Sequence, residues 1–183
     1  MVRRAGAAPG DVVAVTGVIG DGGLGLAAAR GDDVFPDIDR AVLAETFRRP
    51  QPPGFLAGAI GAHASAALDV SDGLIADLGH LARASGVAVW LDLEALPLSP
   101  AAARWLAGQP DRTAGLMRLA TAGDDYQTAM AVSPARWPAL AAAAEAAGVR
   151  LTVIGRCADG TGVEAIGPDG APVAIDVGGW RHF

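Results

Sequence analysis

Three polar residues lie close together in the segment ALDVSDGL, residues 66–73. Asp69, Ser71 and Asp72 follow a short apolar run and precede a predicted helix. Carboxylates at a strand end and a helix start can bind Mg²⁺, while a hydroxyl and helix N–H groups can contact phosphate oxygens. The same letters also fit a strand end followed by a helix cap from Ser71 or Asp72. The cap leaves Asp69 unexplained, because a carboxylate in a half-buried strand is costly without a partner.

Two further segments carry residues with possible chemistry. GDGGLG, residues 20–25, fits the dinucleotide pattern G-x-G-x-x-G, but that fingerprint needs a second parallel strand soon after its helix. Here a loop and another helix follow, so a glycine-lined turn is the preferred interpretation. AGDDYQTAM, residues 122–130, sets two acids before a strand, which is ordinary turn chemistry when taken alone. The histidines lack zinc spacing, and His80 is predicted on the solvent side of its helix.

The elements that position these residues alternate between strands and helices. The helix over 72–86 places Leu74, Leu78 and Leu81 on one face and ends at Gly86. Strands are predicted at 10–17, 66–70, 87–93 and 149–157 and directly after GDDYQ, and helices at 22–30, 37–49, 54–63, 72–86, 99–108, 112–121 and 134–148. This order predicts one α/β or α+β domain over residues 1–183. The sheet need not be all parallel, because the last strands are close enough for a hairpin.

Composition limits the class of partner. Of the 183 residues, 51% are hydrophobic and 19% charged, which excludes a disordered chain. The net charge of −6 argues against nucleic acid or an anionic membrane as partner. A single cysteine, Cys157, excludes an intramolecular disulfide and fits a reducing cytoplasm. Neither a signal peptide nor an apolar run of about 18 residues is visible, so a cytoplasmic protein is expected.

Five segments, taken in order, resemble thiamine-monophosphate kinase, a member of the aminoimidazole ribonucleotide synthetase-like superfamily. They are RRAGAAPGDVVAVTGVIGDGGLGLA, FRRPQPP, ALDVSDGLIADLGHLARASG, AGDDYQTAM and the closing GGWRHF. The resemblance covers the whole chain but only the C-terminal part of that enzyme. It implies a mixed α+β sheet with packed helices, like the C-terminal domain of that superfamily. The family's N-terminal domain, which forms the homodimer and carries most Mg²⁺-binding aspartates, is expected to be absent.

The resemblance also implies roles for individual residues. Arg4 and Ser71 would contact ATP, and Asp69 and Asp72 would each bind a Mg²⁺ ion. Asp124 stands where the family usually has a substrate-contacting glutamate, so its reach is one methylene shorter. The remaining substrate position is the aromatic one near the C-terminus, Trp180, whose indole suits the cationic thiazolium and flat pyrimidine of thiamine.

The expected activity is ATP-dependent phosphorylation of thiamine monophosphate to thiamine diphosphate. Transfer would be direct and in line, with several Mg²⁺ ions neutralising the transferring group and without a covalent intermediate. No residue resembles a strong general base. The alternatives are a non-catalytic half-enzyme or scaffold remnant, or another ATP-using member of the superfamily.

Overall fold

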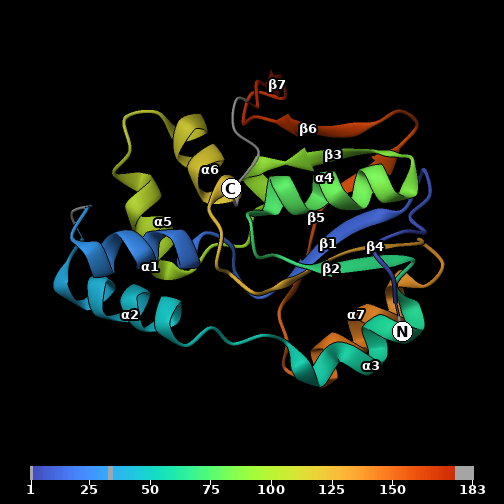
Figure 1. Ribbon diagram of the computed structural model, residues 1–183, viewed down its shortest axis with the longest axis horizontal. Coiled ribbons are helices and arrows are strands. Elements are labelled where there is room, and N and C mark those ends of the chain that lie inside the picture. Colours follow the sequence, from blue (N-terminus) through green and yellow to red (C-terminus); the bar gives the residue numbers. More distant parts are fainter. Residues whose placement is uncertain (1, 33–34, 176–183) are drawn as a thin grey trace.

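The computed structural model describes residues 2–32 and 35–175. They form a seven-stranded sheet with helices on both sides (Figure 1). The strands are β1 (Val12–Thr16), β2 (Ala66–Asp69), β3 (Ala88–Asp92), β4 (Thr128–Val132), β5 (Leu151–Ala158), β6 (Gly162–Ile166) and β7 (Pro172–Val173). The helices are α1 (Asp21–Arg30), α2 (Asp37–Arg48), α3 (Ala57–His63), α4 (Leu74–Ser85), α5 (Pro100–Ala107), α6 (Arg112–Thr121) and α7 (Trp137–Ala146), with 3-10 turns η1 (Gly54–Leu56) and η2 (Leu93–Ala95).

The sheet is mixed, as the sequence predicted. Its strand order is β2-β4-β1-β5-β3-β6-β7. The β3–β6 pair is parallel, while the other neighbouring pairs are antiparallel. The late pair β6–β7 is the expected hairpin, and it extends the sheet at the edge opposite β2.

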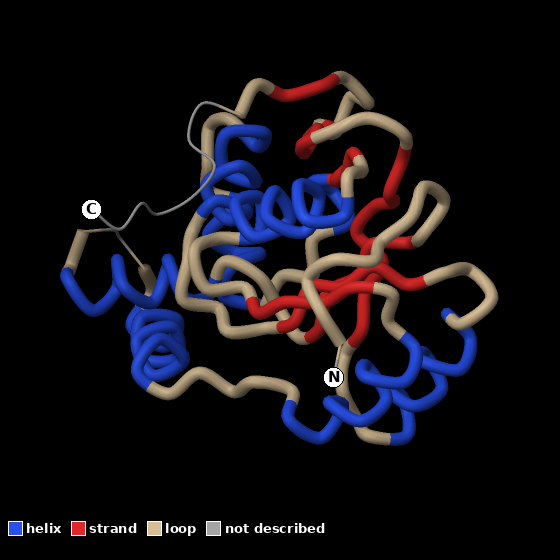
Figure 2. The backbone as a smooth tube through the Cα atoms, turned by 45° about the vertical axis from the view of Figure 1, so that its right-hand side comes forward, coloured by secondary structure: helices blue, strands red, loops and turns tan. Residues whose placement is uncertain are grey.

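Residues alternate between two cores along the central strands, because successive side chains of a strand point to opposite faces. Val13 and Val15 of β1 face the core that contains α4, whereas Ala14 faces the core formed with α3 and α7. Figure 2 shows the strands, in red, between these groups of helices. No helix in the described ranges has the length and apolar character needed to cross a membrane.

Helix α4 confirms the predicted apolar face but begins later than expected. Leu74, Leu78 and Leu81 are fully buried. The helix starts at Leu74 rather than at residue 72 because Gly73 has a φ of 111°, which lies outside the helical region. Its end at Gly86, with a φ of 70°, is as predicted.

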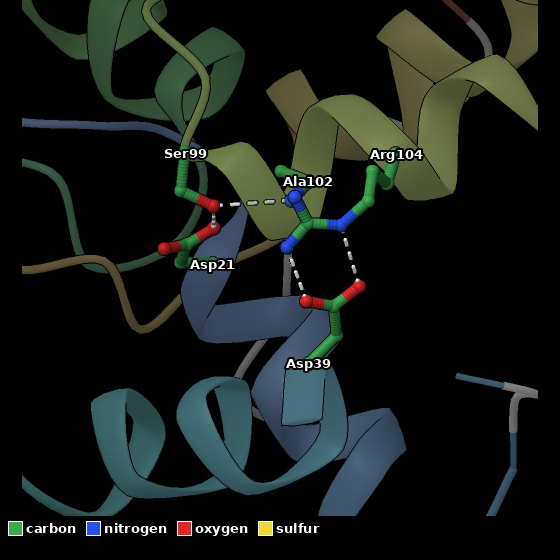
Figure 3. Close-up of polar contacts among 5 residues, drawn as sticks. All are labelled: Asp21, Asp39, Ser99, Ala102 and Arg104. Carbon is green, nitrogen blue, oxygen red and sulfur yellow. Dashed lines mark hydrogen bonds and ion pairs between the residues drawn. The ribbon is translucent and has the colours of Figure 1, made fainter. Parts of the chain in front are cut away.

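Side-chain contacts fix α1 and α2 against α5 (Figure 3). The Ser99 hydroxyl donates to Asp21 Oδ1 at 2.7 Å and accepts the Ala102 N–H at 3.0 Å, so it caps α5 and binds α1 at once. The Arg104 guanidinium donates to both carboxylate oxygens of the buried Asp39 on α2. These contacts give the first turn of α1 a fixed position beside the sheet.

Candidate functional site

The segments DVSD and GDDYQ, far apart in the sequence, lie side by side where β2 ends and β4 begins. The Tyr126 N–H donates to the Val70 carbonyl at 2.8 Å, and the Val70 N–H donates to the Gln127 carbonyl at 2.8 Å. The Asp124 N–H donates to the Ser71 carbonyl at 3.0 Å. Backbone pairing therefore brings together four of the predicted site residues, namely Asp69, Ser71, Asp72 and Asp124.

Asp69 is exposed at the end of β2, and this corrects one step of the sequence argument. The sequence predicted a half-buried carboxylate that needed a partner. The carboxylate is open to solvent instead. The cost of burying a charge therefore does not explain why an acid stands at this position. What places Asp69 in the site is its register opposite Thr128, the first residue of β4.

The cap interpretation of Ser71 and Asp72 is wrong, because the N-cap position of α4 falls on Gly73. Instead, a side chain inside the helix binds the backbone that precedes the helix. Asp77, in the first turn of α4, accepts the backbone N–H groups of Ser71 at 2.9 Å and Asp72 at 3.1 Å. Burial raises the pKa of this Asp77 carboxyl above its usual value, although the two N–H bonds act against that shift. The carboxylate thus fixes the backbone of the segment that carries the predicted ligands.

His80 is half-buried beside these acids and is not simply a surface residue. Ligand atoms of Asp72, Asp77 and His80 all lie within 4.8 Å of one another. The Arg83 guanidinium contacts His80 Nδ1 at 3.1 Å. The histidines have no zinc-ligand spacing along the sequence, so the sequence did not reveal this spatial grouping.

Several acids lie around Tyr126 and affect the pKa of its phenol. The Tyr126 hydroxyl donates to Asp124 Oδ1 at 3.3 Å. The negative charge of Asp124 raises the pKa of the Tyr126 phenol, and burial together with the charges of Asp69 and Asp72 raises it further. Carboxylate oxygens are ligands that Mg²⁺ prefers, and the metal-ligand roles of Asp69 and Asp72 stay predictions.

The backbone N–H groups of the GDGGLG segment bind a protein carboxylate, and its glycines allow close packing. The buried Asp125 accepts the N–H of Gly20 through Oδ2 at 2.8 Å and the N–H of Gly22 through Oδ1 at 2.9 Å. A Cβ on Gly22 would lie 2.4 Å from the Asp124 carbonyl carbon, so only glycine permits this approach. The preferred interpretation, a glycine-lined turn, holds only for Gly20, because Asp21–Gly25 already form the start of α1.

A cavity of about 410 Å³ adjoins the site. Asp69 and Thr128 contribute its polar wall, and Ala57 and Ile60 of α3 contribute apolar surface. A largely apolar hollow beside carboxylates can hold a flat organic group while its phosphates face the acids.

Two predicted residues are not brought into this group by the described contacts. Arg4 is exposed on the N-terminal segment, which pairs with β2 through the Arg3 carbonyl and the Ala67 N–H at 2.9 Å. Trp180 lies outside the described residues, so its substrate role stays a prediction.

Sequence reasoning missed Asp77 and Asp125. An acid in the first turn of a helix, directly after two candidate ligands, was a usable signal for Asp77. Asp125 had no comparable signal, because its partners Gly20 and Gly22 are over a hundred positions away. The pair Asp124-Asp125 only indicated a turn.

The sequence pattern of the family described as "AIR synthase related protein, C-terminal domain" matches residues 8–167, so the chain belongs to this family. The chain is also homologous to the C-terminal part of thiamine-monophosphate kinases.

The relatives support this placement in sequence and structure. Thiamine-monophosphate kinase from Caulobacter vibrioides is 47% identical over 99% of this chain, which spans 50% of that protein. The kinase structure from Stenotrophomonas maltophilia has a TM-score of 0.79 at 35% identity, with 94% of this chain and 54% of the other covered. AaThiL complexed with AMPPCP and TMP has a TM-score of 0.81 at 32% identity, with 100% and 54% covered. The chain therefore spans about half the length of the relatives it matches.

Proposed function

We propose that this chain forms one side of a kinase site that transfers a phosphoryl group from ATP to thiamine monophosphate, giving thiamine diphosphate. The observation that carries the proposal is the backbone pairing of DVSD with GDDYQ, which gathers Asp69, Ser71, Asp72 and Asp124. The relative AaThiL was solved with AMPPCP and TMP, which supports ATP and thiamine monophosphate as the ligand pair.

In this proposal each residue has a distinct task. Asp69 and Asp72 hold Mg²⁺, Ser71 and Arg4 contact ATP, and Asp124 and Trp180 contact thiamine monophosphate. When bound, Mg²⁺ would neutralise charge on the transferring phosphoryl group. The chain itself binds and orients the two substrates.

The domain arrangement and the cellular location are also proposals. Residues 1–183 would form one domain that works with the dimer-forming N-terminal part of the family protein. That the relatives are about twice as long supports this arrangement. The single cysteine, Cys157, supports a reducing cytoplasm as the place of action.

A coupled ADP-release assay tests the proposal. The chain is assayed with ATP, Mg²⁺ and thiamine monophosphate, alone and with the separately produced N-terminal half of the Caulobacter relative. We expect little turnover alone, because the reaction needs several ions and the described site offers few ligands. Turnover should appear with the added half and disappear in Asp69→Asn. Thiamine monophosphate that stimulates no ADP release in the mixture would refute the kinase proposal.

A second candidate is a non-catalytic half that binds ligand or serves as a scaffold. The observation that favours it is the half-length match to the relatives. Binding of ATP and thiamine monophosphate by the mixture, with no turnover under any Mg²⁺ concentration, would select this function instead.

A further inference from the structure

Asp125 is a buried acid that links the GDDYQ turn to the N-terminus of α1. Its side chain is 6% exposed, and each of its oxygens accepts one N–H at the start of α1, from Gly20 and Gly22. The free N–H groups and the dipole at a helix N-terminus both favour a carboxylate there. Because two oxygens are bound to two donors, the side chain can neither rotate nor shift without losing a hydrogen bond.

The residues on either side of Asp125 have an uncommon backbone conformation. Asp124 has a φ of 67° and Tyr126 a φ of 51°, in the left-handed region that residues other than glycine seldom adopt. Such conformations persist where surrounding contacts hold them. On one side the contacts are the N–H bonds from Asp124 to Ser71 and from Tyr126 to Val70. On the other side the contact is the Asp125 carboxylate on α1.

The side chains of this turn divide between the interior and the site. Asp125 points inward and is buried, whereas Tyr126 is 40% exposed and donates to Asp124. Asp124 is half-buried, and its neighbour Asp125 is itself fixed to a helix. The helix is fixed in turn, because Asp21 on its first turn is bound by Ser99 at 2.7 Å (Figure 3).

We propose that Asp125 is a positioning residue, which touches no substrate and holds Asp124 in the place and direction needed to contact thiamine monophosphate. The substrate part of this inference rests on the proposed function. The positioning itself, a turn clamped between β2 and α1, does not depend on it.

The test variant is Asp125→Asn, with Asp21→Asn as its matched control. In Asp125→Asn the amide can accept one N–H, but its NH₂ group faces the other donor, so half of the clamp is lost. Asp21→Asn removes the same charge at the same helix start and keeps an oxygen for the Ser99 hydroxyl. It breaks no bond to the turn. Asp125→Ser, whose hydroxyl can bind one N–H group, replaces the test variant if Asp125→Asn does not fold.

The first measurement is amide hydrogen exchange of the free chain above about pH 7, where the Asp125 carboxyl is ionised and both of its oxygens can accept, and it needs no kinase activity. The reporters are the N–H groups of Asp124 and Tyr126. We expect their exchange to speed up about tenfold or more in Asp125→Asn and to stay within about twofold of the wild type in Asp21→Asn. Equal exchange in wild type and Asp125→Asn would overturn the clamp.

The second measurement is substrate affinity in the mixture with the N-terminal half. Asp125→Asn should weaken thiamine monophosphate binding about tenfold and leave ATP binding within about twofold, while Asp21→Asn changes neither. Equal losses for both ligands, or none, would overturn the positioning role. A wild-type mixture that binds no thiamine monophosphate would instead refute the proposed function and with it the substrate role, and the exchange result alone would then decide the clamp.

Discussion

The buried carboxylate of Asp77 accepts the backbone N–H of Asp72 at 3.1 Å, so a helix residue holds the loop that carries a predicted metal ligand. The same oxygen accepts the Ser71 N–H at 2.9 Å. An acid that the sequence places inside α4 therefore orders the residues before α4. This contact explains how DVSD keeps one conformation although Gly73 interrupts the path from strand to helix.

Replacing Asp77 by alanine should destabilise the chain and disorder the DVSD loop. Two partly buried N–H groups lose their acceptor, which costs about 1–3 kcal/mol in the free energy of unfolding. Urea unfolding measures this loss, and titration of Mg²⁺-ATP into the mixture with the N-terminal half measures the effect on binding. We expect weaker nucleotide binding as well as lower stability.

The matched control for Asp77 is Asp111→Ala. Asp111 caps α6 by accepting the Ala114 N–H at 2.9 Å, and its loss costs about 0.5–2 kcal/mol without touching the site. If both variants lower nucleotide affinity equally, the effect comes from stability alone and the role given to Asp77 is wrong.

Asp69→Asn should remove activity and leave stability nearly unchanged. The side chain is exposed, and surface changes without buried partners stay within about 0.5 kcal/mol. A lost metal ligand should instead lower turnover by at least about tenfold. Thermal melts of the chain and ADP release in the mixture give the two numbers. Asp159→Asn, an exposed acid away from the site, is the control, and a similar turnover in both variants would argue against Asp69 as a ligand.

Local patterns predicted the elements well, because each pattern is complete within one segment. The apolar spacing of α4 and its stop at Gly86 needed no distant contact. Boundaries shifted where a single backbone angle decided them, as at Gly73.

The site was predictable only in part, since its geometry depends on pairing between distant segments. The sequence indicated Asp69, Ser71 and Asp72 as one group and Asp124 as a separate candidate, and the β2–β4 pairing makes them neighbours. The contact between the Asp125 carboxylate and the N-terminus of α1 could not be predicted from either segment. GDDYQ was explained as an ordinary turn and GDGGLG as a glycine-lined turn, so neither segment indicated a distant partner.

Restoring the family's usual glutamate at position 124 should strengthen substrate binding. Asp124→Glu lengthens the side chain by the one methylene that the family resemblance implies, so we expect several-fold tighter binding of thiamine monophosphate in the mixture. A φ of 67° suits aspartate better than glutamate, so the variant should lose up to about 1 kcal/mol of stability. Isothermal titration and urea unfolding measure the two effects.

Asp124→Asn is the companion variant for this comparison. Asparagine also tolerates the left-handed conformation but carries no charge, so it should keep stability and weaken binding. If Asp124→Glu weakens binding as much as Asp124→Asn does, residue 124 does not contact the substrate in the proposed way.

The pH dependence of stability should carry the signature of Asp125. Burial, helped by the charges of Asp21 and Asp124 and opposed by the two N–H bonds from Gly20 and Gly22, raises the pKa of its carboxyl from the usual 3.8 to about 7. Between about pH 4 and pH 7 the folded chain keeps a proton that the unfolded chain has released. The contribution of Asp125 to the unfolding free energy therefore falls as pH rises through this window, by roughly 4 kcal/mol at most.

Urea unfolding of wild type and Asp125→Asn at several pH values isolates this contribution, because every other titrating group is shared. The wild type should lose stability relative to the variant as pH rises from about 5 to about 7.5. Burial also raises the pKa of Asp21, so Asp21→Asn should remove a second contribution of the same sign. Parallel stability profiles of wild type and Asp125→Asn would show that Asp125 is ionised in both states throughout, with its two N–H donors outweighing its burial.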